Sequence, residues 1–116
     1  MYRIFGFLTK RDGMSMSEFK DYYENSHIPL ILSLAPHPTA YTRRYLNRDE
    51  KLTEGGTPVD FDAVTELVFP DQAAFLAWMG KIMGPENIDR VAADEAKFLD
   101  RSQTRAYIVD ERATVG

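Results

Sequence analysis

The chain of 116 residues contains no cysteine and only two histidines. Without cysteine it has no disulfide bond, no thiolate metal site and no cysteine nucleophile. This composition fits a reducing compartment, and we expect a cytoplasmic protein. One pocket histidine with scattered carboxylates does not make a metal site, and the sequence has no glycine-rich phosphate loop or nucleotide-binding fingerprint. We therefore expect no metal and no cofactor.

Positive charge and long apolar segments are also scarce. The 18 acidic and 14 basic residues give a net charge of −4, and no lysine and arginine cluster is present that would neutralise phosphates. The apolar stretch 2–8 is short and contains Arg3, so it is neither a signal segment nor a membrane span. We expect this stretch to belong to the fold, and we expect neither nucleic acid nor membrane as a partner.

Apolar side chains are plentiful, at 44% of the residues, and 12% are aromatic. This content is enough to bury a core, and the length suits one domain. No solenoid-type repeat or low-complexity segment occurs. We therefore expect a single domain over residues 1–116.

The segment "SMSEFKDYYENSHIPL" has the pattern of an amphipathic helix. Ser15 and Glu18 have the spacing of a capping box, which places the start of the helix at Ser15. Pro29 disfavours helical geometry at the residue before it, so we expect the helix to stop there, with His27 on the flank of its apolar face. Residues 30–38 then read as an apolar connection across the domain.

The other elements follow from apolar periodicity and from the positions of glycine and proline. Aromatic or alternating segments predict four strands, at residues 2–8, 39–47, 61–69 and 102–111. Helical spacing predicts a second helix in two pieces, at residues 70–84 and 85–99. The polar tract 48–60 is predicted to be an exposed loop.

The resulting order, βαββαβ, is that of an α+β, ferredoxin-like fold with one four-stranded antiparallel sheet covered by helices on one side. Strands 2–8 and 61–69 carry apolar residues on both faces, whereas a sheet with one face in water alternates more cleanly. We therefore expect a second copy of the chain to cover the other sheet face, giving a homodimer.

The segments "SMSEFKDYYENSHIPL", "YTRRY", "FDAVTELVFPDQAAFLAW" and "FLDRSQTRAYIVDE", taken in this order, resemble the EthD family of the dimeric α/β-barrel superfamily. The resemblance spans nearly the whole chain. It implies a ferredoxin-like monomer that dimerises sheet to sheet, with a pocket between the sheet and the helices of each subunit. Relatives include cofactor-free methylmuconolactone isomerases, polyketide cyclases, and decarboxylases or dehydratases of phenolic products, besides a member linked to ether degradation. The isomerase branch carries a cysteine in its third strand, where this chain has Leu67. The isomerisation of methylmuconolactone in particular is therefore not expected here.

His27 is the first candidate for catalysis, because an imidazole can act as base and then as acid near neutral pH. The resemblance implies the same role, since the histidine at this position is the one most often assigned to catalysis. The structural alternative is that His27 caps carbonyls at a helix end, where the helix dipole favours a positive charge.

Tyrosines are the next candidates. Tyr22 and Tyr23 lie about one helical turn before His27, where their hydroxyls would bind a phenolic or carbonyl oxygen of a substrate while their rings line an apolar pocket. The alternative is that both simply belong to the core. Tyr41 is similar to a pocket tyrosine of the isomerase branch, and this resemblance implies a part in catalysis.

Two arginines and a glutamate complete the set. Arg43 and Arg44 are neighbours on a strand and face opposite sides of the sheet, so one of them points inward and can hold an enolate or a carboxylate. Glu66 lies in the middle of an apolar strand, where a charge needs a partner or a raised pKa. It is either a second acid or base at the substrate site, or the partner of an arginine.

These residues predict cofactor-free acid–base chemistry on a small aromatic or polyketide-like molecule, by cyclisation, dehydration, decarboxylation or lactone isomerisation. His27 would move the proton, and Tyr41 with the inward arginine would hold the developing oxyanion. Two alternatives stay open: a non-catalytic accessory or metabolite-binding protein of a degradation or biosynthesis pathway, and a cofactor-free oxygenase.

Overall fold

The computed structural model describes residues 1–116 and contains one antiparallel sheet of four strands. The strands are β1 (Tyr2–Leu8), β2 (Ala40–Tyr45), β3 (Ala63–Phe69) and β4 (Arg105–Val109). Their order across the sheet is β2-β3-β1-β4, so β1 and β3 form its centre, as in a ferredoxin-like fold. The four predicted strands and the α+β fold class are confirmed.

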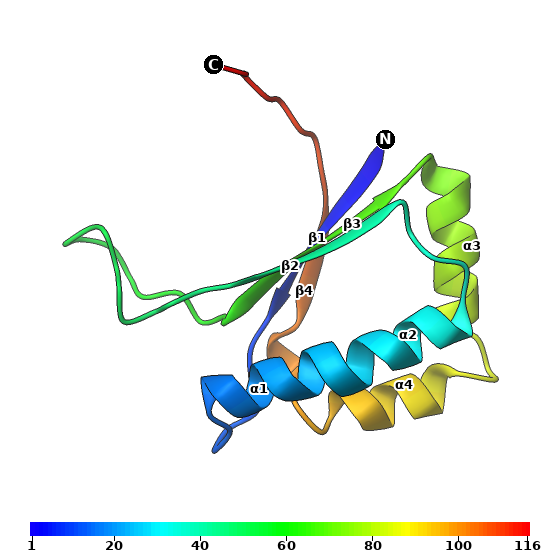
Figure 1. Cartoon of the computed structure of the whole chain (residues 1–116), viewed down its shortest axis with the longest axis horizontal. Coiled ribbons are helices and arrows are strands. Elements are labelled where there is room, and N and C mark those ends of the chain that lie inside the picture. The colour runs from blue at the N-terminus through cyan, green and yellow to red at the C-terminus, as the bar shows by residue number, and fades with distance from the viewer.

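Helices cover one face of this sheet (Figure 1). They are α1 (Met16–Tyr22), α2 (Ile28–Leu34), α3 (Gln72–Ile82) and α4 (Ile88–Glu95). Figure 1 shows α1 and α2 as one continuous rod below the sheet with α4 beside it, while α3 stands near the end of α2. The expected division of the second helical region into two pieces is confirmed, and a short 3-10 turn (Arg101–Gln103) precedes β4.

The start of α1 is fixed by the capping box predicted from the sequence. The Glu18 N–H donates to Ser15 Oγ at 3.1 Å, and the Ser15 N–H donates to Glu18 Oε1 at 3.0 Å. Two backbone donors that the first helical turn leaves unpaired are thereby satisfied. The helix that carries His27 therefore begins at a defined position.

Pro29 does not end this helix, and the prediction that it would is wrong. Residues Tyr23–His27 form a π-helical turn, in which the N–H of Ile28 donates to the carbonyl of Tyr23. The turn places Pro29 in the first turn of α2, where its missing N–H costs no helical hydrogen bond. The chain therefore stays helical through Leu34, although this segment was expected to be an irregular connection.

The core lies between the sheet and the helices and forms two clusters. The first joins α1 and the π-helical turn to the residues after α4, and its largest fully buried members are Phe19, Tyr23 and Phe98. The second lies against α3 and includes Phe69 and Trp78, whose ring centroids are 5.5 Å apart. Burial of these large apolar side chains is the main favourable term in folding.

The other face of the sheet is not covered by any helix and is rich in aromatic side chains. Phe5 pairs across the strands with Tyr107, which is 59% exposed. Phe7 packs against the rings of Phe61 and Tyr107 at centroid distances of 5.0 and 6.2 Å. We call this surface, centred on Phe5, Phe7 and Tyr107, the outer sheet face.

Candidate functional site

His27 is paired with a carboxylate on another helix. Its Nδ1 lies 2.7 Å from Asp94 Oδ2, and the Tyr22 hydroxyl donates to Asp94 Oδ1 at 2.5 Å. The side chains of His27 and Asp94 are 7% and 13% exposed. An ionised carboxylate only accepts hydrogen bonds, so the proton on His27 lies on Nδ1 and the other ring nitrogen, Nε2, is left without it in the neutral ring.

Local structure brings these three residues together. Tyr22 is the last residue of α1, and His27 ends the π-helical turn that follows it. On the opposing helix, Asp94 has the spacing that places it on the face of α4 that carries the buried Val91. The carboxylate therefore projects from the apolar face of α4 toward the helical rod.

Two aromatic rings pack against the ring of His27. Its centroid lies 4.8 Å from that of Phe98 and 5.7 Å from that of Tyr23. Nε2 has no hydrogen-bond partner, yet no side-chain nitrogen or oxygen in the protein is both fully buried and unpaired. Nε2 of His27 is therefore not fully buried.

A pair of tyrosines lies beside His27. The hydroxyls of Tyr23 and Tyr41 are 2.8 Å apart, which links the π-helical turn to β2. Burial raises the pKa of Tyr41 to about 12, and burial together with Tyr41 raises the pKa of Tyr23 well above its ordinary value. Burial and the hydrogen bond to Asp94 likewise raise the pKa of Tyr22 to about 12. All three hydroxyls therefore stay protonated at neutral pH, and Tyr22 uses its hydrogen to bind Asp94.

Arg43 is the inward arginine, and its charge is neutralised by Glu24. Its Nε and Nη2 donate to the two oxygens of Glu24 at 2.9 and 2.5 Å. Hydrogen bonds from Arg43 lower the pKa of Glu24. The Tyr45 hydroxyl also donates to Glu24, at 2.5 Å. The guanidinium lies 5.2 Å from the ring centroid of Tyr41, which joins this ion pair to the tyrosine pair.

Glu66 lies on the opposite face of the sheet. It accepts hydrogen bonds from Arg3 Nη1 at 3.0 Å and from Arg44 Nη1 at 3.2 Å. Glu66 is 8% exposed, so both arginines partner a carboxylate that has little access to water. The structure therefore brings His27, Tyr22, Tyr23, Tyr41 and Arg43 together on the helix side of the sheet, and it places Glu66 on the other side.

Three residues of this site were not found by reading the sequence: Asp94, Glu24 and Tyr45. Asp94 had a detectable signal, because it is a carboxylate at a position that helical spacing places on the apolar face of its helix. Tyr45 shares its strand face with Tyr41 and Arg43, which the alternation of β2 indicated. The pairing of Glu24 with Arg43 had no local signal in the sequence.

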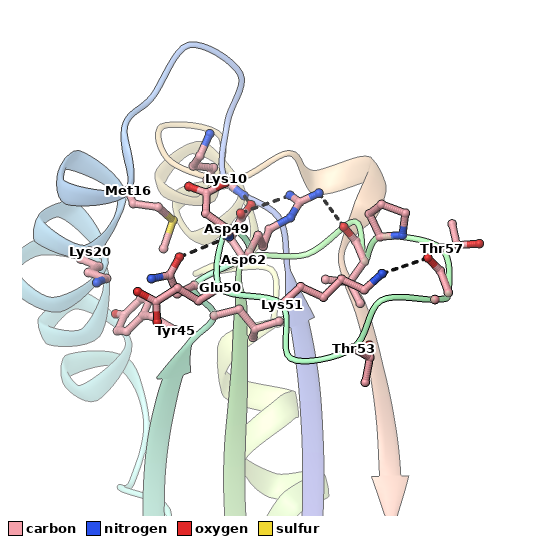
Figure 2. Close-up of a pocket in the computed structure, with 17 residues that line it drawn as sticks. Lys10, Met16, Lys20, Tyr45, Asp49, Glu50, Lys51, Thr53, Thr57 and Asp62 are labelled. Atoms are coloured by element: carbon pink, nitrogen blue, oxygen red, sulfur yellow. Dashed lines mark hydrogen bonds and ion pairs between the residues drawn. The ribbon is translucent and has the colours of Figure 1, made fainter.

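A separate cavity lies at the end of the sheet where the segment between β2 and β3 folds back (Figure 2). It measures about 1070 Å³ and is bordered by α1, by Tyr45 and by residues 46–59. We call it the loop cavity. A second, shallower hollow of about 330 Å³ lies between α2 and α4, where Asp94 forms part of its wall.

Nowhere do three or more histidine, aspartate or glutamate side chains gather in a way that could hold a metal ion. None of the helices has both the length and the apolar character needed to cross a membrane.

A family model described as EthD domain matches residues 11–102. This range begins just before α1 and ends in the 3-10 turn after α4, so it includes all the residues of the His27 cluster. No curated protein matched the chain.

Solved structures show the same fold at low sequence identity. An EthD family protein of Bacillus halodurans is 17% identical, with a TM-score of 0.61 over 97% of this chain and 100% of its own. A dimeric ferredoxin-like protein of unknown function from Thermobifida fusca is 13% identical, with a TM-score of 0.57 over 93% and 88%. A protein of Arabidopsis thaliana is 14% identical, with a TM-score of 0.64 over 99% of each chain. At these low identities, the structural similarity shows a shared fold alone.

Proposed function

The chain belongs to the EthD family, and on this premise we propose that it is a cofactor-free acid–base enzyme acting on a small, mostly apolar, oxygenated molecule. The observation that carries the proposal is the pairing of His27 with Asp94 at 2.7 Å. A carboxylate on Nδ1 fixes the tautomer of the imidazole and stabilises the imidazolium that forms when Nε2 takes a proton. Nε2 of His27 is then a base that is held in a fixed orientation and is not fully buried.

The proton step follows from this arrangement. Nε2 removes a proton from a carbon next to a carbonyl, or from a phenol, and the imidazolium then returns it to another atom of the same molecule. Asp94 is held in place while the proton moves, because Tyr22 also donates to it. Cyclisation, dehydration, decarboxylation and lactone isomerisation all use such a relay, and an aromatic or polyketide-like metabolite suits the aromatic surroundings.

The tyrosine pair supplies a donor for the oxyanion that the proton step creates. When one of two hydroxyls donates to the other, the accepting hydroxyl keeps a free hydrogen. Tyr23 and Tyr41 are in this relation at 2.8 Å, and both stay protonated at neutral pH. A donor placed in advance stabilises the charge as it develops. Arg43, held by Glu24, packs over the ring of Tyr41 and helps to position this pair.

Proton transfer can be tested without knowing the natural substrate. We expect the protein to accelerate exchange of the hydrogens next to the carbonyl of 2-tetralone or 1-indanone with D₂O, followed by proton NMR. A positioned base is worth on the order of 10²–10⁴-fold, so the rate should exceed that of an equal concentration of free imidazole by at least about 10². Exchange no faster than imidazole with either ketone would favour the accessory or metabolite-binding alternative instead.

We further propose that two copies pair through the outer sheet face. The exposed aromatic side chains there support this proposal, since an apolar sheet face is normally covered. Glu66, paired with Arg3 and Arg44 beside these rings, would enter the interface already neutralised. The area buried should exceed the ~800 Å² of ordinary crystal contacts.

Tyr107→Glu should dissociate this dimer, because it places a charge in the middle of an apolar interface. Sedimentation at micromolar concentration is expected to give a dimer for the natural chain and a monomer for the variant. Leu76→Glu is the matched control, since Leu76 is similarly exposed, at 57%, but lies on α3. A natural chain that sediments as a monomer, or a Tyr107→Glu variant that stays dimeric, would contradict this arrangement.

A further inference from the structure

The loop cavity has an apolar floor built by regular elements. Tyr45 at the end of β2 and Met16 in the first turn of α1 both line it, and both pack against the first core cluster. Figure 2 shows them on the α1 side of the cavity, opposite the backbone that carries Thr53 and Thr57. The volume of about 1070 Å³ is close to the upper limit for small-molecule sites. A flat apolar body fits against Tyr45 and Met16.

Three of the seven charged side chains that line this cavity already have partners. Arg48 donates to Asp62 Oδ1 at 3.3 Å and to the carbonyl of Val59 at 2.5 Å. Lys51 Nζ donates to the carbonyl of Gly56 at 3.1 Å. Figure 2 marks these bonds as dashed lines. They hold the segment in its folded-back shape. They leave these groups little freedom to bind a ligand.

Lys20 differs from these groups, because its ammonium group has neither an ion pair nor a hydrogen bond. It lies 5.4 Å from the ring centroid of Tyr45, directly over the apolar floor. Lys10, also without an ion pair, lines the same cavity from the other side of Met16. The carboxylates without ion pairs, Asp49 and Glu50, lie on the loop rather than on the regular elements. A ligand that rests on the floor therefore brings its charged group beside an ammonium.

We propose that the loop cavity binds a small organic carboxylate with an aromatic or alicyclic body. The body packs on Tyr45 and Met16, and the carboxylate binds the ammonium of Lys20, with Lys10 as the second cation. Binding expels the water between the body and the floor, which strengthens the ion pair. This inference does not rest on the chemistry proposed for His27, so either can fail without the other.

The test uses 2-naphthoate as the probe and calorimetric titration of the full chain. 2-Naphthamide, which has the same shape and no charge, is expected to bind at least about tenfold more weakly. Lys20→Gln should weaken naphthoate binding roughly threefold to tenfold, as expected for one partly exposed charge pair. Glu50→Gln should strengthen it about twofold, because a like charge is removed. Thermal melts confirm that each variant is folded.

Two control variants locate the effect. Lys81→Gln removes an exposed lysine of α3 that does not line the cavity, and it should leave naphthoate affinity unchanged. His27→Gln should also leave it unchanged, which separates this site from the acid–base cluster. Equal affinity for the acid and the amide, no detectable binding of naphthoate up to about 10 mM, or an unaffected Lys20→Gln variant would each overturn the proposal.

Discussion

Phe98→Ala is expected to lower the free energy of unfolding by about 3–5 kcal/mol, the usual cost of emptying a fully buried aromatic position. Phe98 is completely buried, and its ring lies 4.8–5.9 Å from the rings of His27, Tyr23, Tyr22 and Phe19. These four residues come from the helical rod, so the cavity would open between the rod and the segment after α4. Urea denaturation followed by circular dichroism measures the loss.

Two further variants keep this prediction testable. A loss of this size can exceed the total stability of a small domain, so Phe98→Leu, expected to cost about 1–2 kcal/mol, serves where the alanine variant does not fold. Leu76→Ala is the control, because Leu76 is 57% exposed on α3 and should change stability by less than about 0.5 kcal/mol. If Phe98→Leu and Leu76→Ala cost the same, Phe98 does not hold the rod in place.

The fold could be predicted from the sequence because its elements are marked by strong local patterns. The capping box of Ser15 and Glu18 set the start of α1, and alternation in β2 placed Tyr41, Arg43 and Tyr45 on one face. The prediction that Pro29 ends the helix was wrong, because it considered only the residues next to the proline. Burial of Tyr23 and His27 against the sheet and α4 favours a continuous rod, and the π-helical turn provides it.

Local patterns predicted proximity only among site residues of one element, whereas Tyr41 was included through the family resemblance. His27, Tyr22 and Tyr23 share one helix, so their proximity follows from helical spacing. Asp94 lies 67 residues further along the chain from His27, and the pair depends on how α4 packs beside the rod, which no local pattern defines. The loop cavity was missed for a related reason, since residues 46–59 have no periodicity that predicts where they fold back.

His27→Gln is expected to reduce ketone exchange by on the order of 10²–10⁴-fold, because glutamine cannot take up a proton. Its amide can still donate to Asp94 in place of Nδ1, so the carboxylate is not left with Tyr22 alone. The loss of ring contacts with Phe98 and of a charge-assisted hydrogen bond should cost about 1–2 kcal/mol of stability. Both rates are measured by NMR at a protein concentration where thermal melts show the variant to be folded.

Asp94→Asn separates positioning from catalysis at the same site. Asparagine can donate as well as accept, so His27 is no longer restricted to one tautomer, and exchange should slow by roughly 10–10³-fold, less than in His27→Gln. Nitrogen-15 spectra of the imidazole should show protonated Nδ1 and bare Nε2 in the natural chain, and a mixture of tautomers in Asp94→Asn. Tyr22→Phe, which removes only the second donor to Asp94, should keep the single tautomer and most of the rate. If His27→Gln exchanges ketone hydrogens as fast as the natural chain, the histidine and its carboxylate only join α4 to the helical rod, and the acid–base proposal is wrong.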